Sequence, residues 1–265
     1  MTFVIAVSNE KGGVAKTTTS LALGSSLAKT GQRVLLIDLD SQADLTLGVG
    51  LSPNSTSYAS IDLLVPGIAK TFFIESFCLP TGFNNLNIIP SNGDMFMLER
   101  KISSIQPSSK TLRQALKPSI PLPYDYIIID CPPALDPRTV NALTACDLLI
   151  IPTQAEYFSA NSIRKMLDLI RYIRKEANPF LAYRILITML DLRNGIHVRV
   201  SDLFQKKFEA CLFKTQIEID THLRDSQTAG VPITNYMPSS RGSLQYSNLA
   251  QEISEYVEKR SRNQA

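Results

Sequence analysis

The sequence predicts an α/β fold in which helices flank a doubly wound, mostly parallel sheet. Apolar runs without polar alternation recur along the chain, which is typical of parallel strands that are covered on both faces. Segments with apolar residues at helical spacing separate these runs, as in successive strand–helix–strand units. The first strand leads into a loop that contains Gly12-Gly13 and Lys16-Thr17, the layout of a phosphate-binding loop. We expect one domain over residues 1–265.

Length and composition agree with this fold class. A chain of 265 residues with 44% hydrophobic residues can bury a sizeable core in a single domain. No apolar run approaches the roughly 18 residues of a membrane-spanning helix, and the run at 3–7 is interpreted as a strand and not as a signal peptide. The four cysteines are far apart and contain no C-x-x-C pair, which argues against a zinc site and favours buried thiols in a cytoplasmic protein.

Strands and helices are expected to alternate along the whole chain. The strands, from continuous apolar runs, are predicted at 3–7, 33–38, 86–90, 124–130, 148–152 and 183–190. The helices, from apolar residues at helical spacing, are predicted at 18–27, 95–102, 110–117, 139–145, 159–177, 198–211 and 242–260. Ser91 or Asn92 can cap the second of these helices. Residues 43–82 are expected to be irregular with one or two short helices. Residues 118–123 form a proline-rich connector, and residues 212–240 alternate short elements with loops.

The loop after the first strand has the residue types that bind nucleotide phosphates. Its backbone N–H groups and the N-terminus of the next helix face an anion. Lys16 is placed to reach the β- and γ-phosphates, and the Thr17 hydroxyl is placed to hold Mg²⁺. The loop departs from the pattern G-x-x-x-x-G-K-[ST], because Glu10 and Ala15 stand where that pattern has glycine.

The loop instead matches the variant K-G-G-V-G-K-T-T, which opens with a second lysine, except at Ala15. Residues 11–18 resemble the deviant Walker A loop of the ParA/MinD family of ATPases. The resemblance implies a P-loop NTPase fold, with ATP and Mg²⁺ as cofactors. It also implies that Lys11 reaches the nucleotide of a partner subunit, in an ATP-sandwich homodimer. The loop residues implied to contact ATP are Lys11, Gly12, Gly13, Val14, Ala15, Lys16, Thr17 and Thr18.

Ala15 raises a question about the backbone of the loop. If this position needs a positive φ, the Cβ atom costs about 1 kcal/mol or more. If the residue has helical dihedral angles at the start of the helix, alanine is harmless. We expect helical dihedral angles at Ala15, because the other residues of the nucleotide site are intact.

Acidic residues follow two of the predicted strands. Asp130 comes directly after three isoleucines, and ligands of open α/β sheets lie beyond the carboxyl ends of the strands. Asp130 can therefore meet Mg²⁺, directly or through a water molecule. Asp38 and Asp40 end the second strand, and alternate residues of an extended chain point the same way. Both carboxylates can thus face the phosphates.

The resemblance assigns different roles to these two aspartates. In the family, the second aspartate of D-x-D-x-Q orients the attacking water and the first lies near Mg²⁺, which implies these roles for Asp40 and Asp38. Ser41 stands where the family usually has proline, and residues 130–133 resemble its switch II. The metal-site residues implied are Thr17, Asp38 and Asp130, and the catalytic residues implied are Lys11, Lys16 and Asp40.

Later segments resemble the same family. The similar stretches are 89–92, 141–147, 188–191 and 238–242. In the family the adenine base of the nucleotide lies between the stretch that matches 188–191 and the region that matches 238–242. The resemblance therefore implies that Asp191 and Pro238 lie near the base.

Basic residues are concentrated in one part of the chain. Residues 161–214 contain 11 Lys and Arg against 5 Asp and Glu, which fits either a nucleic-acid surface or solvated helix faces. Soj-type members of the family bind DNA nonspecifically through Arg and Lys; Arg193 matches one of these arginines, and His222 stands at the place of another. The candidate DNA-binding residues are Arg193, Arg199, Lys206, Lys207, Lys214 and Arg224.

The resemblance implies a cytoplasmic, nucleoid-associated partition or positioning ATPase. Such a protein dimerises on ATP, binds double-stranded DNA nonspecifically, and is released when an adaptor stimulates hydrolysis. The cargo is a plasmid, a chromosome region or a protein compartment such as a carboxysome. The adaptor is accordingly ParB-like or McdB-like.

Three other functions are less well matched by the sequence. A MinD-like membrane ATPase needs a basic amphipathic C-terminal helix, but residues 252–260 contain three acids and no Phe, Trp or Leu, so we expect no membrane partner. An iron–sulfur reductase needs cysteines that bridge a dimer, and Cys131 and Cys146 lack cluster spacing. A site-specific regulator of this kind carries an N-terminal helix-turn-helix, whereas this sequence starts at the first strand.

Overall fold

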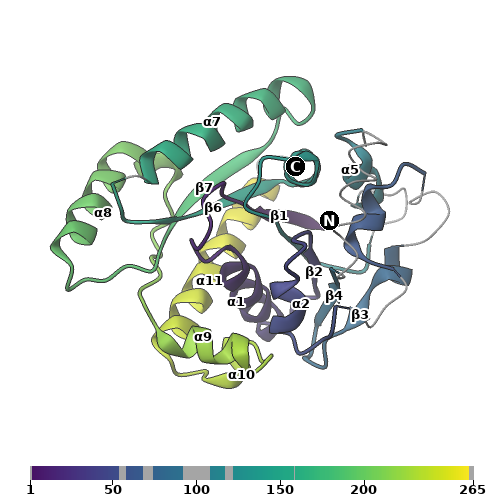
Figure 1. Cartoon of the computed structure of the whole chain (residues 1–265), viewed down its shortest axis with the longest axis horizontal. Coiled ribbons are helices and arrows are strands. Elements are labelled where there is room, and N and C mark those ends of the chain that lie inside the picture. The colour runs from purple at the N-terminus through teal and green to yellow at the C-terminus, as the bar shows by residue number, and fades with distance from the viewer. Residues whose placement is uncertain are drawn as a thin grey trace.

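The computed structural model describes residues 2–53, 58–67, 74–91, 108–116, 122–157 and 159–262. Seven strands form one sheet in the order β3-β4-β2-β5-β1-β6-β7 (Figure 1). All neighbouring strands pair in parallel except β3 and β4. Strand order runs in both directions from β1, and helices lie on both faces, so the prediction of a doubly wound, mostly parallel sheet is confirmed.

The strands and helices have the following bounds. The strands are β1 (Phe3–Val7), β2 (Val34–Asp38), β3 (Leu79–Pro80), β4 (Leu86–Ile89), β5 (Tyr126–Asp130), β6 (Leu148–Gln154) and β7 (Ala182–Thr188). The α-helices are α1 (Lys16–Lys29), α2 (Asp44–Gly48), α5 (Thr111–Leu116), α6 (Pro137–Ala145), α7 (Ser159–Glu176), α8 (Gly195–Phe208), α9 (Thr221–Thr228), α10 (Ile233–Tyr236) and α11 (Arg241–Arg262). Short 3-10 helices are η1 (Ser60–Leu64), η2 (Ile74–Phe77) and η3 (Glu209–Cys211).

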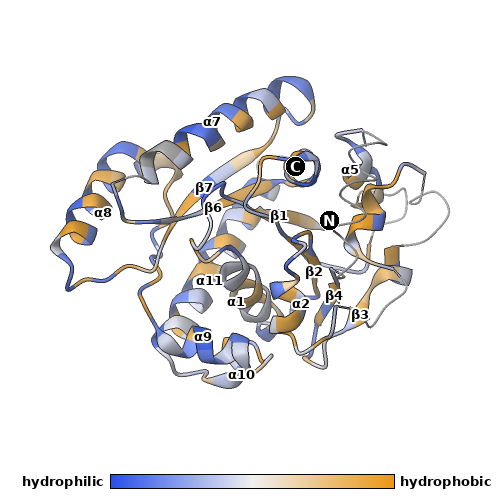
Figure 2. Cartoon of the chain, viewed as in Figure 1, coloured by the Kyte–Doolittle hydropathy of each residue, from blue (hydrophilic) through white to orange (hydrophobic). Residues whose placement is uncertain are grey.

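The core has two layers because successive side chains of a strand point to opposite faces of the sheet. In β1, Val4 and Ala6 pack on the face covered by α5, α6 and α7, whereas Ile5 packs on the face covered by α1 and α11. Both layers are apolar, and Figure 2 shows hydrophobic residues along the strands and a mixture of hydrophobic and hydrophilic residues on the helices. This double coverage explains why the strands read as continuous apolar runs.

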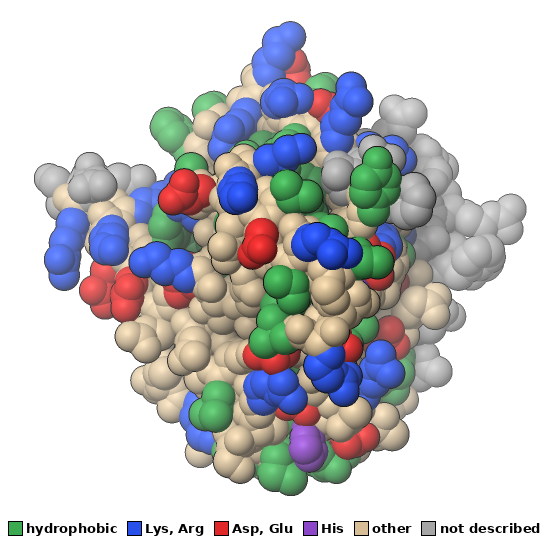
Figure 3. All heavy atoms as spheres, turned by 90° about the vertical axis from the view of Figure 1, so that its left-hand side faces the viewer, with side chains coloured by type: hydrophobic (Ala, Val, Ile, Leu, Met, Phe, Trp, Pro, Cys, Tyr) green, Lys and Arg blue, Asp and Glu red, His purple; other side chains and the backbone are tan. Residues whose placement is uncertain are grey.

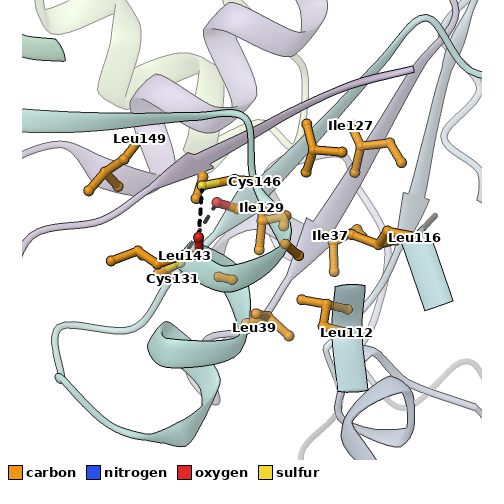
Figure 4. Close-up of a cluster of buried hydrophobic side chains, with 14 of the residues drawn as sticks. Ile37, Leu39, Leu112, Leu116, Ile127, Ile129, Cys131, Leu143, Cys146 and Leu149 are labelled. Carbon is orange, nitrogen blue, oxygen red and sulfur yellow. Dashed lines mark hydrogen bonds between the residues drawn. The ribbon is translucent and has the colours of Figure 1, made fainter. Parts of the chain in front are cut away.

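Two cysteines lie in the first of these layers. Cys131 and Cys146 are fully buried among leucine and isoleucine side chains (Figure 4). Burial raises the pKa of the Cys131 thiol well above its usual value, so this residue packs and is not a nucleophile. The prediction of buried thiols holds for these two residues, whereas Cys78 and Cys211 are only half-buried.

The predicted strands and helices match elements of the structure to within a few residues where both can be compared. The described part of 43–82 contains three short helices, α2, η1 and η2, and not one or two. The predicted helix at 95–102, its cap at Asn92 and most of the connector at 118–123 lie outside the described residues. The short antiparallel strand β3 was not predicted. Helix α8 begins at Gly195 and not at 198, because the Asn194 side chain caps it by accepting a hydrogen bond from the Ile196 N–H at 3.0 Å.

Strand register places the chemically important residues at one edge of the sheet. Val7, the last residue of β1, lies opposite Asp130 on β5, and Asp38 on β2 lies opposite the same residue. The loop after β1 and both carboxylates therefore meet beyond the carboxyl ends of adjacent strands. Within the described residues, no helix is both long and apolar enough to cross a membrane.

Candidate functional site

The loop between β1 and α1 is fixed by side chains from its neighbours. The buried Asn9 side chain donates to the carbonyl of Pro152 at 2.8 Å and accepts from the backbone N–H of Lys11 at 3.0 Å. The Thr188 hydroxyl, at the end of β7, donates to the Val14 carbonyl at 3.1 Å. Strands β6 and β7 therefore hold the loop in shape.

Ala15 does not have the helical dihedral angles that we expected. It is the N-cap residue of α1 and has φ 63° and ψ 38°, in the left-handed region. Its carbonyl already accepts the first helical hydrogen bond, from the Thr19 N–H at 2.9 Å. The expectation was wrong because the chain must reverse between the loop and the helix at this residue, and a Cβ atom there costs about 1 kcal/mol.

Replacing Ala15 by Gly is expected to raise the free energy of unfolding by about 0.5 to 1 kcal/mol, because glycine adopts a positive φ without steric cost. Urea denaturation of the nucleotide-free protein measures this change. Ala22→Gly is the matched control, since Ala22 lies inside the same helix; it should lower the free energy of unfolding by about 1 kcal/mol. A loss of stability in Ala15→Gly would contradict the strain at this position.

Lys16 and Lys11 both contact their own chain. Lys16 is 7% exposed, and its Nζ donates to the carbonyl of Lys11 at 3.1 Å. Burial lowers the pKa of Lys16, while Asp130 and Asp40 act in the opposite direction. Lys11 lies at the rim, where its Nζ contacts Glu156 Oε2 at 2.6 Å and Gln154 Oε1 at 3.1 Å.

Asp130 lies directly behind the first turn of α1. Its Oδ2 accepts a hydrogen bond from the Thr17 hydroxyl at 2.7 Å, and its Oδ1 accepts one from the Ser20 hydroxyl at 2.8 Å. Burial raises the pKa of Asp130 to about 7, against the effect of these two hydroxyls. Ser20 follows Thr17 by one helical turn, and this spacing is a signal from which its contact with Asp130 could have been predicted.

Asp38 and Asp40 have different surroundings. The Asp38 carboxylate is fully buried and accepts hydrogen bonds from the N–H and the hydroxyl of Thr46 at 2.9 and 2.7 Å, which ties it to α2. Burial, and next the charge of Asp130, raise the pKa of Asp38 to about 8. The Asp40 carboxylate is half-buried and accepts only the Gln42 N–H, at 3.1 Å, among the contacts of the described residues.

These oxygen atoms fit Mg²⁺. The Thr17 hydroxyl and the Asp130 carboxylate are hard oxygen ligands in direct contact, and two buried carboxylates with raised pKa values favour a cation nearby. The described residues contain no group of three or more His, Cys, Asp or Glu side chains that could hold a metal ion. The pair of Thr17 and Asp130 is compatible with Mg²⁺, which keeps several waters and takes few protein ligands beside substrate phosphates.

Comparisons with known proteins decide the family. The family model described as an AAA domain matches residues 2–183. Sporulation initiation inhibitor protein Soj of Bacillus subtilis is 37% identical over 251 residues, which cover 94% of this chain and 97% of Soj. Chromosome partitioning protein ParA of Caulobacter vibrioides is 33% identical over 252 residues, which cover 94% and 93%. The chain belongs to the ParA/Soj family of P-loop ATPases.

A solved structure agrees with this assignment. Cobyrinic acid a,c-diamide synthase from Mycobacterium smegmatis, with bound ATP analog and magnesium, is 28% identical and superposes with a TM-score of 0.80 over 95% of this chain and 93% of that one. The loop with Lys11 and Lys16 is therefore the deviant Walker A loop of a ParA-family ATP hydrolase.

A small cavity of about 70 Å³ opens beside the Walker A loop of this ParA-family protein. Ala15 and Thr18 line one side of it, and Met189 from the predicted base segment lines another. Neither Asp191 nor Pro238 is among its lining residues, and the Asp191 carboxylate instead pairs with Arg193 at 2.9 Å. Sequence reasoning missed several lining residues because they come from distant segments: Glu218, Ile219, Asp220, Leu223, Arg224, Gln227 and Tyr246.

The basic candidates are exposed residues of α8, of α9 and of the segments beside α8. Figure 3 shows the side on which α7 and α8 lie, where Lys and Arg side chains outnumber Asp and Glu. Arg193 is engaged by Asp191, and this contact lowers the pKa of the aspartate. The other five candidates are exposed and form no ion pair with another described residue: Arg199, Lys206, Lys207, Lys214 and Arg224.

The nucleotide-free ATPase is expected to become less stable as pH rises from about 4 toward 8. The folded-state pKa values of Asp130 and Asp38 are raised to about 7 and about 8, against about 4 in an unfolded chain. The folded protein therefore binds more protons in this window, and its free energy of unfolding falls as pH increases. The affinity for Mg²⁺ with ATP should rise over the same window, because Asp130 must be ionised.

Urea denaturation at a series of pH values tests this expectation. Asp38→Asn removes one of the two titrating carboxyls, so its stability should depend less steeply on pH than that of the wild-type protein between pH 5 and about 8. Identical slopes for the two proteins would contradict the raised pKa of Asp38.

Proposed function

We propose that this ParA-family ATPase is a DNA-associated partition or positioning protein. It forms an ATP-sandwich dimer, binds double-stranded DNA nonspecifically, and hydrolyses ATP when an adaptor protein stimulates it. The proposed cargo is a plasmid, a chromosome region or a carboxysome-like compartment, with a ParB-like or McdB-like adaptor. The protein is then cytoplasmic and nucleoid-associated. The names of Soj and of the Caulobacter ParA, a chromosome partitioning protein, support this proposal.

The observation that carries the proposal is the position of Lys11. Its side chain is 31% exposed and lies against Glu156 and Gln154 at the rim, whereas Lys16 from the same loop is enclosed. In this proposal Lys16 binds the phosphates of its own subunit. Lys11 turns outward and exchanges the Glu156 carboxylate for a phosphate. A rim lysine that can change partners suits contact with the nucleotide of a second subunit.

The proposal assigns the following roles to the residues around the nucleotide. The Walker A loop and Lys16 hold the phosphates, with Thr18 near the ribose or base. Thr17 and Asp130 hold Mg²⁺, which neutralises charge on the phosphates, and Asp38 lies behind them. Asp40, whose carboxylate is half-buried, orients the attacking water. The base then lies near the segment that contains Asp191 and near Pro238.

DNA binding is proposed for the exposed basic residues of α8 and of the segments before and after it. Arg193, Arg199, Lys206, Lys207, Lys214 and Arg224 are the candidates, and five of them have no carboxylate partner among the described residues. Nonspecific binding needs only a set of phosphate contacts of this kind, and it weakens steeply with salt. The MinD-like alternative is disfavoured because Ile253, Tyr256 and Val257 of the C-terminal helix pack against the core.

Lys11→Ala is expected to bind ATP but to lose ATP-dependent dimerisation and DNA retention, because Lys16 still holds the phosphates and the cross-subunit contact is gone. Light scattering with size exclusion measures the dimer. Retention on random-sequence duplex DNA, at about 50 and 200 mM salt, measures DNA binding.

Lys110→Ala, at an exposed lysine far along the chain, is the control and should behave as the wild-type protein. An unchanged ATP-dependent dimer in Lys11→Ala would remove the cross-subunit role. Flotation of the wild-type protein with anionic liposomes, without retention on DNA, would favour the MinD-like alternative.

A further inference from the structure

The glutamate that precedes the rim lysine has its own partner on α7. Glu10 Oε1 accepts a hydrogen bond from Lys165 Nζ. Its neighbour Lys11 pairs with Glu156, just before α7, at 2.6 Å. The adjacent loop residues Glu10 and Lys11 therefore form ion pairs with Lys165 and Glu156, which belong to one segment of the chain. The loop and α7 are joined by a pair of crossed ion pairs.

The Glu10 carboxylate is partly enclosed by the protein. Glu10 Oε2 is buried and has no hydrogen-bond partner among the described residues, although the Glu10 side chain as a whole is 31% exposed. A carboxylate with one oxygen enclosed in this way depends on the cation at its other oxygen. Lys165 is that cation, and its side chain is 61% exposed.

The place of Glu10 makes this cation relevant to ATP. Glu10 stands at the start of a loop that must accept a triphosphate, and an uncompensated carboxylate there repels the phosphates. Glu10 also directly precedes Lys11, so a fixed Glu10 fixes the backbone from which the Lys11 side chain extends.

We propose that Lys165 on α7 is a positioning residue for the Walker A loop, which neutralises Glu10 and fixes the start of the loop against α7. The inference rests on the ATP site described above. When Lys11 exchanges Glu156 for a phosphate, the contact between Glu10 and Lys165 stays in place. The Lys11 side chain then moves, while the Glu10–Lys165 contact holds the backbone of Glu10 and Lys11 in place.

A double-mutant cycle tests this role. Lys165→Met leaves the Glu10 carboxylate without its cation, and it should weaken ATP affinity about fivefold while the kcat stays close to that of the wild-type protein. Glu10→Gln removes the carboxylate and so removes the need for Lys165. The double variant Glu10→Gln, Lys165→Met should therefore bind ATP nearly as tightly as the wild-type protein. Titration calorimetry and steady-state kinetics supply the two readouts.

Arg164→Met is the matched control, because it removes an exposed charge next to Lys165 on the same helix, and it should leave ATP affinity unchanged. Thermal melts exclude a general loss of folding as the cause of the effect. Wild-type affinity in Lys165→Met, or a double variant as weak as that single variant, would overturn the proposal. Failure of the wild-type protein to bind ATP would instead contradict the nucleotide site itself, before any variant is compared.

Discussion

The Lys16→Ala variant is expected to lose ATP binding, with an affinity at least about 100-fold weaker than that of the wild-type protein, or about 3 kcal/mol. The Lys16 side chain is buried, its ammonium group donates to the loop carbonyl of Lys11, and the charges of Asp130 and Asp40 act on it. No other described lysine or arginine of the loop is buried, so none can replace its charge against the phosphates. Titration calorimetry with Mg²⁺ and ATP measures the loss.

Lys29→Ala is the control for this variant. Lys29 lies at the other end of the same helix, where its Nζ donates to the carbonyl of Thr234 at 2.9 Å. Its removal should leave ATP affinity unchanged. Lys16→Ala should also fold, because its side chain makes one hydrogen bond to the loop and no ion pair closer than 4 Å with a described residue. Measurable ATP binding at wild-type strength in Lys16→Ala would show that the phosphates lie elsewhere.

Much of the fold could be predicted because one physical pattern repeats. The strands other than β3 are largely buried, so they appear in the sequence as apolar runs, and the helices between them imply parallel pairing. The parallel order of the strands also explains why Asp130 and the loop after β1 lie close together, as expected from the sequence. Both follow strands at their carboxyl ends, and adjacent parallel strands bring those ends together.

Contacts between distant segments could not be predicted in the same way. The partners of Lys11 and Glu10 come from the end of β6 and from α7. They depend on β6 lying next to β1, which local patterns do not specify. The cavity beside Ala15 likewise takes its walls from residues 217–227, which have no recognisable nucleotide motif.

The backbone at Ala15 shows a different limit. Helical dihedral angles were expected there because the other residues of the nucleotide site are intact, and alanine is harmless in a helical conformation. The structure has a positive φ because the loop is fixed by β6 and β7 on one side and by α1 on the other. Local preference loses to tertiary constraint at this residue, and such strain is typical of functional loops.

The second large effect is expected at Asp40. Asp40→Ala should bind ATP but hydrolyse it at least about 100-fold more slowly, the range expected when a group that positions or activates water is removed. Asp40 suits this role because its carboxylate is half-buried and accepts only one backbone N–H among the described contacts, whereas Asp38 and Asp130 are enclosed and fully engaged. Slow hydrolysis should leave the ATP-bound dimer trapped. Single-turnover hydrolysis and light scattering measure the two effects.

Asp44→Asn separates this role from a change in local charge. Asp44 is an exposed carboxylate at the start of α2, close enough to Asp40 for their charges to interact, and burial followed by that interaction raises its pKa. A variant at Asp44 changes the charge of the same region without removing the Asp40 carboxylate, which we propose to orient the water. Its hydrolysis should stay near the wild-type rate. If Asp40→Ala also turns over at the wild-type rate, the water is positioned by another group, and the two buried carboxylates become the candidates.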